Sequence, residues 1–233
     1  MSLYKSAIRD LQSDTAFGFI ARRFLFTLQP CMKRRLSLLL CLVLATAVSL
    51  AQNPDIDLLR RLNLHRNRSL DSVLIAITES AAPLAYSLPL LLLLVALWKR
   101  RAALREKAMT IILSAIVSLL LSTFIKTLVH RTRPFITYPD LEKLSTGGSG
   151  SFPSGHTADA FTLATSLTLA FPRWWVAGPA FAWALTVGYS RMHLGVHYPS
   201  DVAASLVLGT ACSWVVYTIR TRPHRSGLPR KIA

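Results

Sequence analysis

The chain has 233 residues, of which 52% are hydrophobic and only 16% are charged, and its mean hydropathy is +0.41. An ordinary soluble domain carries about 25% charged residues, so this composition argues against a soluble domain and favours a membrane protein. The net charge of +16 does not indicate nucleic-acid binding, since 18 of the 27 Lys and Arg residues fall in alternate loops, where the positive-inside rule places cytoplasmic charge. We therefore expect no nucleic-acid partner, and both termini in the cytoplasm.

Residues 1–35 are expected to form a cytoplasmic N-terminal extension, followed by an apolar segment at 36–52. This segment fits a first transmembrane helix. It also fits a signal peptide cleaved after Ala51, because a basic region, an apolar core and small residues follow one another. We favour the helix, since 31 residues precede Met32, and both interpretations leave Asn53 outside the cytoplasm.

Residues 53–79 are expected to form an extracytoplasmic interfacial segment made of two short helices. Apolar residues in its second half recur at the i, i+3, i+4, i+7 spacing of one helical face, namely Leu70, Val73, Leu74 and Ile77. We interpret the segment as a solvated connector rather than as a lid over a substrate.

Residues 80–220 contain five further apolar runs, which begin near Ser80, Ala108, Thr157, Trp174 and Ser200. A helix that crosses a bilayer needs roughly 17 to 25 apolar residues, and the run after Asp159, with 13 uncharged residues, is the shortest. The predicted fold is an all-α, polytopic membrane helix bundle with six transmembrane helices, or five if the first is a cleaved signal peptide. Residues 221–233 are expected to be a basic cytoplasmic tail.

Three groups of polar residues lie where these runs end on the predicted extracytoplasmic side. The first group is Lys126 and Arg133, with Pro134 expected to end the third span. The second is Pro153-Ser154-Gly155-His156, directly before an apolar helix. Because a helix N-terminus offers unbonded N–H groups and a positive dipole end, Ser154 and Gly155 are candidates to bind an anion, with His156 above it.

The third group joins the fifth and sixth spans and contains Arg191, His197 and Asp201. Asp201 follows His197 by four residues, so its carboxylate can fix the tautomer of the imidazole and leave the other nitrogen as a nucleophile or base. An ordinary helix-capping aspartate beside an interfacial histidine is the alternative. With the cations of the other groups, these residues supply what phosphoryl transfer requires.

The three groups resemble the three signature motifs of the type 2 phosphatidic acid phosphatase (PAP2) superfamily. The resemblance covers roughly residues 80–220 and every signature position. It implies a PAP2/haloperoxidase-like core and a metal-independent membrane phosphatase. It also implies that His197 is the nucleophile that forms a phosphohistidine, that Asp201 orients it, and that His156 protonates the leaving oxygen and later activates water. The implied phosphate-binding residues are Lys126, Arg133, Ser154, Gly155 and Arg191.

The expected substrate is a lipid phosphate whose tails stay in the bilayer, such as phosphatidate, phosphatidylglycerol phosphate, undecaprenyl diphosphate or a lipid A phosphate. We expect no metal site and no cofactor, since the six histidines have no carboxylate cluster beside them. Asp159, one turn after His156, either complements the helix N-terminus or helps to hold His156. A vanadate-dependent haloperoxidase and a membrane protein that binds lipid phosphate without turnover are the alternative functions.

Overall fold

The computed structural model describes residues 54–145, 147–148 and 150–221, which all belong to one compact unit, residues 45–233. The predictions for the extension (1–35), for the first span or signal peptide (36–52) and for the tail beyond residue 221 lie outside the described residues. The described chain contains only helices and loops. Its elements are α4 (Pro54–Leu64), η1 (Arg68–Leu70), α5 (Asp71–Glu79), α6 (Ala81–Trp98), α7 (Ala102–Val129), α8 (Pro134–Thr137), α9 (Gly155–Ala170), α10 (Trp174–His193) and α11 (Pro199–Arg220).

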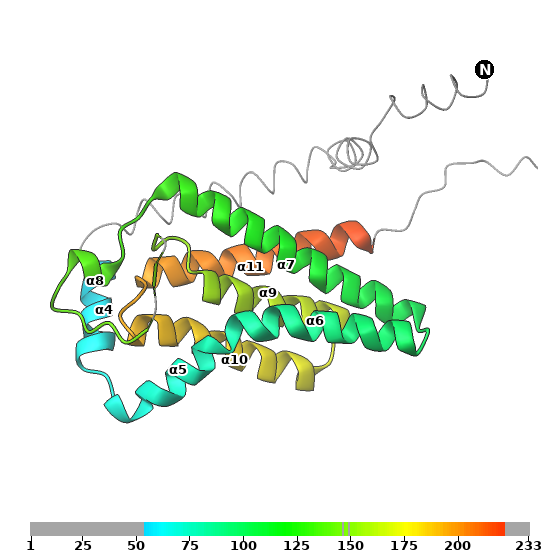
Figure 1. Ribbon diagram of the computed structural model, residues 1–233, viewed down its shortest axis with the longest axis horizontal. Helices are drawn as coiled ribbons and strands as arrows, with labels where there is room; N and C mark the ends of the chain where they lie inside the picture. Colours follow the sequence, from blue (N-terminus) through cyan, green and yellow to red (C-terminus); the bar gives the residue numbers. More distant parts are fainter. Residues whose placement is uncertain (1–53, 146, 149, 222–233) are drawn as a thin grey trace, which may run out of the picture. The chain divides into compact units, whose positions relative to one another are not determined.

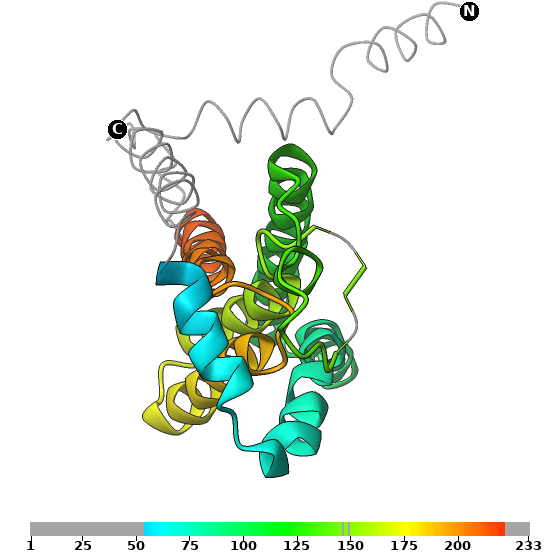
Figure 2. The same cartoon turned by 90° about the vertical axis from the view of Figure 1, so that its left-hand side faces the viewer.

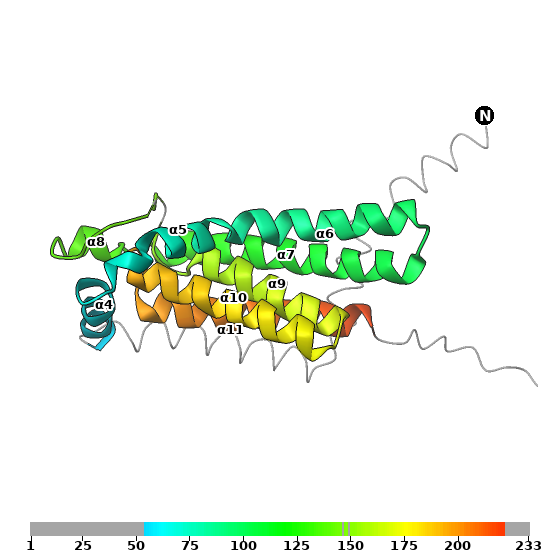
Figure 3. The same cartoon turned by 90° about the horizontal axis from the view of Figure 1, so that it is seen from below.

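The five long helices, α6, α7, α9, α10 and α11, run alongside one another, whereas α4 and α8 lie at one end of them (Figures 1 and 3). Within the described residues, three stretches are long and apolar enough to cross a membrane, namely Arg68–Trp98, Ala102–Thr137 and Pro199–Arg220. Large apolar side chains on α6 and α7 point outward, with Leu94 62% and Leu120 64% exposed. This outward apolar surface is the one that a lipid environment covers.

Helix α9 lies at the centre of the bundle and packs against α6, α7, α10 and α11. It has 16 residues, most of them buried, and two of its hydroxyls bond to neighbouring helices. Thr162 pairs with Ser118 of α7 at 2.8 Å, and Ser166 pairs with Ser213 of α11 at 3.0 Å. Small and hydroxyl residues allow helices to approach closely inside a membrane bundle, which suits the central position of α9. With 16 residues, α9 is shorter than the three candidate spans.

Four chain segments meet at the end of the bundle that carries α4 and α8 (Figure 1). They are the C-terminus of α7, the N-terminus of α9, the C-terminus of α10 and the N-terminus of α11. Helix α7 ends at Val129 and is followed by His130, which adopts a left-handed conformation with φ 47°. The sequence predicted that Pro134 ends this helix, which was wrong. Pro134 instead starts the short helix α8, because a proline is well tolerated in the first turn of a helix.

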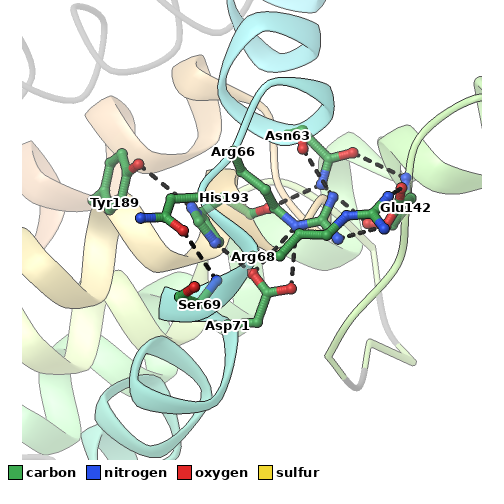
Figure 4. Close-up of polar contacts among 9 residues, drawn as sticks. Asn63, Arg66, Arg68, Ser69, Asp71, Glu142, Tyr189 and His193 are labelled. Atoms are coloured by element: carbon green, nitrogen blue, oxygen red, sulfur yellow. Dashed lines mark hydrogen bonds and ion pairs between the residues drawn. The ribbon is translucent and has the colours of Figure 1, made fainter.

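The segment before α6 is only in part the solvated connector that we predicted, because some of its side chains are exposed and others are buried. Asn63 is fully buried and donates to the backbone carbonyls of Glu142 and His193 at 3.0 and 2.9 Å. The Arg66 side chain, only 3% exposed, pairs with Asp71 and Glu142. Figure 4 shows how these side chains join the loop after α8 to the end of α10. The prediction was therefore wrong at Asn63 and Arg66, whose side chains bond to protein groups rather than to water, whereas Arg68 is exposed with a side-chain exposure of 77%.

Candidate active site

A cavity of about 240 Å³ opens at this end of the bundle. Figure 2 views the molecule from here and shows α4 lying across the bundle end. Six of the residues around the cavity are candidates named from the sequence, and two are glycines of the loop before α9. The lining consists of Lys126, Arg133, Gly147, Gly148, Gly155, His156, Arg191 and His197. The structure therefore brings the three motif groups to one cavity, with both histidines on its wall.

His197 lies in the turn between α10 and α11. Gly195 makes this turn possible with φ +70°, and a side chain there would lie 2.5 Å from the carbonyl oxygen of Glu142. The backbone N–H of His197 donates to the carbonyl of Arg191 at 3.2 Å. The turn thus fixes the imidazole, which is only 2% exposed, next to the arginine that precedes it.

The two ring nitrogens of His197 face different partners. Nε2 lies 3.3 Å from a guanidinium nitrogen of Arg133. Because a guanidinium only donates hydrogen bonds, this contact favours the tautomer in which Nε2 carries a lone pair and Nδ1 carries the proton. Nδ1 lies 3.5 Å from Oδ2 of Asp201, a separation that is long for a hydrogen bond. Burial lowers the pKa of His197 to about 4, against the opposing effect of Asp201, so the imidazole is neutral and able to attack an electrophile.

Asp201 is fully buried and does not line the cavity. Its Oδ2 accepts a hydrogen bond from the backbone N–H of Tyr198 at 3.0 Å and another from the Ser151 hydroxyl, and its Oδ1 accepts one from Arg131 at 2.7 Å. Asp201 therefore caps α11 and lies beside His197 at the same time. The two alternatives drawn from the sequence, a capping residue and a partner of the histidine, both describe its position.

The N-terminus of α9 points its first turn at the cavity, where Gly155 and His156 form part of the wall. Within the described residues, no side chain caps this helix start. The Ser154 hydroxyl instead pairs with that of Thr157 at 2.9 Å, and Ser154 is buried behind the cavity rather than on its wall. The arrangement leaves backbone N–H groups of a helix N-terminus directed at the space where an anion would sit.

Three cationic side chains face the same space, from α7, from the loop after it and from α10. Arg133 donates to the carbonyl oxygen of Val196 at 3.0 Å, which holds it next to the His197 turn. Arg191 is 1% exposed and donates from Nη1 to the hydroxyls of Thr78 and Ser145, at 3.0 and 3.2 Å. Because the three positive charges around one cavity repel one another, the site favours a ligand that carries several negative charges.

Several residues around the site were not predicted from the sequence. Thr78 and Ser145 orient Arg191, and Gly147 lies against Arg133, where a Cβ atom would come within 2.7 Å of Nη1. Ser151 and Arg131 bind Asp201. The only sequence signal was the position of Arg131 and Ser151 inside or beside the motif groups, because contacts with α5 and with the loop depend on tertiary structure.

Asp159 does not contact His156 through a hydrogen bond. Its Oδ1 accepts a hydrogen bond from the Tyr86 hydroxyl of α6 at 3.1 Å. Across the part of the chain that the structure describes, no group of three or more His, Cys, Asp or Glu side chains is arranged to hold a metal ion.

Residues 107–225, slightly more than half of the chain, match the family model of the PAP2 superfamily. The chain is 35% identical over 104 residues to a lipid A 4'-phosphatase of Bacteroides thetaiotaomicron, a match that covers 42% of this chain and 46% of that protein, less than half its length. It is 30% identical over 154 residues to the undecaprenyl-diphosphatase BcrC of Bacillus subtilis, covering 66% of this chain and 76% of that protein.

A solved structure gives a similar result for the fold. The transmembrane PAP2-type phosphatidylglycerolphosphate phosphatase of Bacillus subtilis superimposes with a TM-score of 0.67 at 25% identity, covering 80% of this chain and 97% of the other. The family match contains all three motif groups that surround the cavity. This chain therefore belongs to the PAP2 superfamily and is a multi-pass membrane phosphatase of the PAP2 type.

Proposed function

We propose that the protein hydrolyses the phosphomonoester or diphosphate group of a membrane lipid through a phosphohistidine intermediate. The observation that carries this proposal is the cavity itself, in which two imidazoles, three cationic side chains and a helix N-terminus converge at one end of an apolar bundle. A phosphate headgroup fits this chemistry, while the lipid tails remain beside the exposed apolar faces of the helices. A soluble phosphate ester would not need that apolar surface.

The geometry supports specific roles for the cavity residues. Lys126, Arg133 and Arg191, with the backbone N–H groups at the start of α9, neutralise the phosphoryl oxygens. Nε2 of His197 attacks phosphorus and forms an N–P bond while the bond from phosphorus to the leaving oxygen breaks. His156 gives its proton to that oxygen. In the second half of the reaction His156 takes a proton from water, which attacks phosphorus and releases inorganic phosphate from His197.

We also propose that the cavity faces away from the cytoplasm and that α9 and α10 cross the membrane with the three apolar stretches. The bundle end opposite the cavity carries the turn Lys99-Arg100-Arg101 and the exposed rings of Trp98 and Trp174. Basic residues mark cytoplasmic loops and tryptophans favour the membrane interface, so this end suits the cytoplasmic surface. With a first span before residue 53, the total would be six.

The relatives differ in the lipid that they are named for, namely lipid A, undecaprenyl diphosphate and phosphatidylglycerolphosphate. All three lipids carry a terminal phosphoryl group on a large apolar anchor. The cavity of about 240 Å³ recognises that shared group, and we propose a lipid phosphate of this class as the substrate.

The test is phosphate release by the purified protein in detergent micelles, measured over a panel of these lipids and phosphatidate. The His197→Ala variant should lose release while still inserting into the membrane, and His65→Ala, which changes an exposed histidine, should retain it. Full activity of His197→Ala would contradict the proposal. Lipid binding without turnover by the unaltered protein would indicate a binding protein instead, and vanadate-dependent bromination would indicate a haloperoxidase.

A further inference from the structure

A buried ion-pair chain lies behind the nucleophile, on the side away from the cavity. Arg131 donates from Nη1 to Oδ1 of Asp201 and from Nη2 to Oδ2 of Asp55, both at 2.7 Å. Asp55 is 5% exposed and Asp201 is fully buried. The order of contacts is therefore Asp55, Arg131, Asp201 and His197, and only the last of these residues lines the cavity.

Further contacts fix the arginine in this position. The Ser200 hydroxyl accepts from Arg131 at 2.6 Å and donates to Asp55, whose Oδ1 also accepts from the Ser200 N–H at 2.9 Å. The guanidinium lies 3.9 Å from the centre of the Tyr198 ring. The backbone carbonyl of Arg131 accepts from the N–H of Ser151 at 2.8 Å. Arg131 therefore joins the loop after α7, the loop before α9 and the start of α11.

The charges in this chain are unequal. Two carboxylates share one guanidinium, so the group behind His197 carries one net negative charge, while the cavity in front carries three cations. Burying ionised groups is costly unless each one is paired and hydrogen-bonded. To begin α11, the cap formed by Asp201 alone would be enough, and Asp55 and Arg131 would not be needed.

We propose that Arg131 and Asp55 are positioning residues for the phosphoryl-transfer step, an inference that rests on the proposed function. Arg131 holds the carboxylate of Asp201 against Nδ1 of His197. Asp55 holds Arg131 and restores the negative charge that the guanidinium would otherwise cancel. When His197 becomes phosphorylated on Nε2, its ring gains positive charge and Nδ1–H shortens its distance to Asp201. Neither Arg131 nor Asp55 touches the substrate.

The two residues should affect the imidazole in opposite directions. The charged and titratable groups that face His197 are Asp201 of α11, Arg133 after α7, Arg191 of α10 and His156 of α9. Removing the positive charge of Arg131 makes the environment more negative and favours the imidazolium, so the pKa of His197 should rise. Removing the negative charge of Asp55 should lower it. A shift of roughly half a pH unit in each direction is expected from one added or lost charge near this pair.

The experiment compares Arg131→Gln, Asp55→Asn and the double variant with the unaltered protein in micelles. The pKa of His197 is followed by NMR of ¹⁵N-histidine-labelled protein, with the His197 signals assigned by their loss in His197→Ala. We expect opposite shifts in the two single variants and near cancellation in the double variant. At neutral pH, kcat for phosphate release should fall roughly 10- to 100-fold in Arg131→Gln with little change in KM, the range found when a residue that orients a metal-binding histidine is removed. Arg131→Lys should restore part of it.

A matched control exists in the pair Arg60 and Asp140, which are 2.9 Å apart but 40% and 45% exposed. Arg60→Gln and Asp140→Asn should leave kcat and the His197 signals unchanged. Thermal unfolding of every variant shows whether it folds, and Asp55→Asn keeps the Arg131–Asp201 contact if Arg131→Gln does not fold. Shifts in the same direction, or none, would overturn the inference. If His197→Ala remained active, the proposed function itself would fail, whatever these variants show.

Discussion

Gly147 and Gly148 are neighbours in the loop over the cavity, and the structure predicts opposite outcomes for the same substitution at each. An ideal Cβ atom at Gly147 would lie 2.7 Å from Nη1 and 2.8 Å from Cζ of Arg133, whereas one at Gly148 meets nothing within 4 Å. The guanidinium of Arg133 lies 3.3 Å from Nε2 of His197. Gly147→Ala should therefore displace a cation of the active site, and Gly148→Ala should not.

The size of the effect follows from the displacement. An ordinary contact starts near 3.4 Å, so the difference from 2.7 Å requires Nη1 to retreat by about 0.7 Å. Misplacement of a catalytic group by about 1 Å costs about 100-fold in rate, and a hydrogen bond to a charged group is worth about 1.5–3 kcal/mol. Both figures lead us to expect that kcat/KM falls between about 10- and 100-fold in Gly147→Ala.

The assay is the initial rate of phosphate release from a micellar lipid phosphate, measured for the two variants and the unaltered protein over a range of substrate concentrations. Equal thermal unfolding temperatures for the two variants would show that the loss lies in the site rather than in the fold. If Gly147→Ala and Gly148→Ala had the same kcat/KM, the assignment of Arg133 as a phosphate-binding cation held by the glycine loop would be refuted.

Four other outcomes are expected. Gly209→Ala places a Cβ atom 2.6 Å from a backbone oxygen of α9 and should lower the unfolding temperature by an amount equivalent to about 1–3 kcal/mol, whereas Gly178→Ala, which meets nothing within 4 Å, should not. Arg66→Ala removes a buried ion-pair partner and should lower the free energy of unfolding several times more than Arg68→Ala, as measured by thermal unfolding. The Arg68 side chain is 77% exposed, and an ion pair at such a position contributes about 1 kcal/mol at most. Burial lowers the pKa of His197 to about 4, from about 6.5 in the unfolded chain, so the unfolded state binds more protons between pH 4 and 6.5. The free energy of unfolding should therefore fall as the pH drops from about 6.5 to about 4, and His197→Ala should weaken this pH dependence. EDTA should leave kcat unchanged, since the three cavity cations carry the charge that a metal would otherwise supply, and a loss that added Mg²⁺ restores would contradict this.

The sequence was sufficient for the parts of the molecule that depend on local patterns. The predicted helix starts near Ser80, Thr157, Trp174 and Ser200 lie within two residues of the observed ones, because apolar runs bounded by charge, proline or glycine mark helices directly. The spacing of the motif groups also indicated which residues surround the cavity. It did not show that Ser154 lies behind the wall, since its hydroxyl orientation depends on Thr157.

Contacts between distant segments were beyond such patterns. Arg131 and Asp55 are separated by 76 positions, and Asn63 and His193 by 130, and no periodicity connects either pair. A polar residue in a short helix has the same appearance in a sequence whether water or protein surrounds it. Our prediction of a solvated connector therefore failed at Asn63 and Arg66, where buried partners replace solvent.

The position of α9 explains why the site forms where it does. This helix contacts four others, so its N-terminus is brought to the cavity among the ends of α7, α10 and α11. An anion bound there is attracted by the helix N-terminus and by the three cations from α7, the loop after it and α10, while the carboxylates lie behind His197 and away from the phosphate. The negative charge behind the nucleophile stabilises the imidazole as it gains positive charge during the attack, while the cations in front of it stabilise the phosphoryl oxygens. The predicted run after Asp159 was the shortest because this charged residue lies inside α9, one turn after the helix start that faces the cavity.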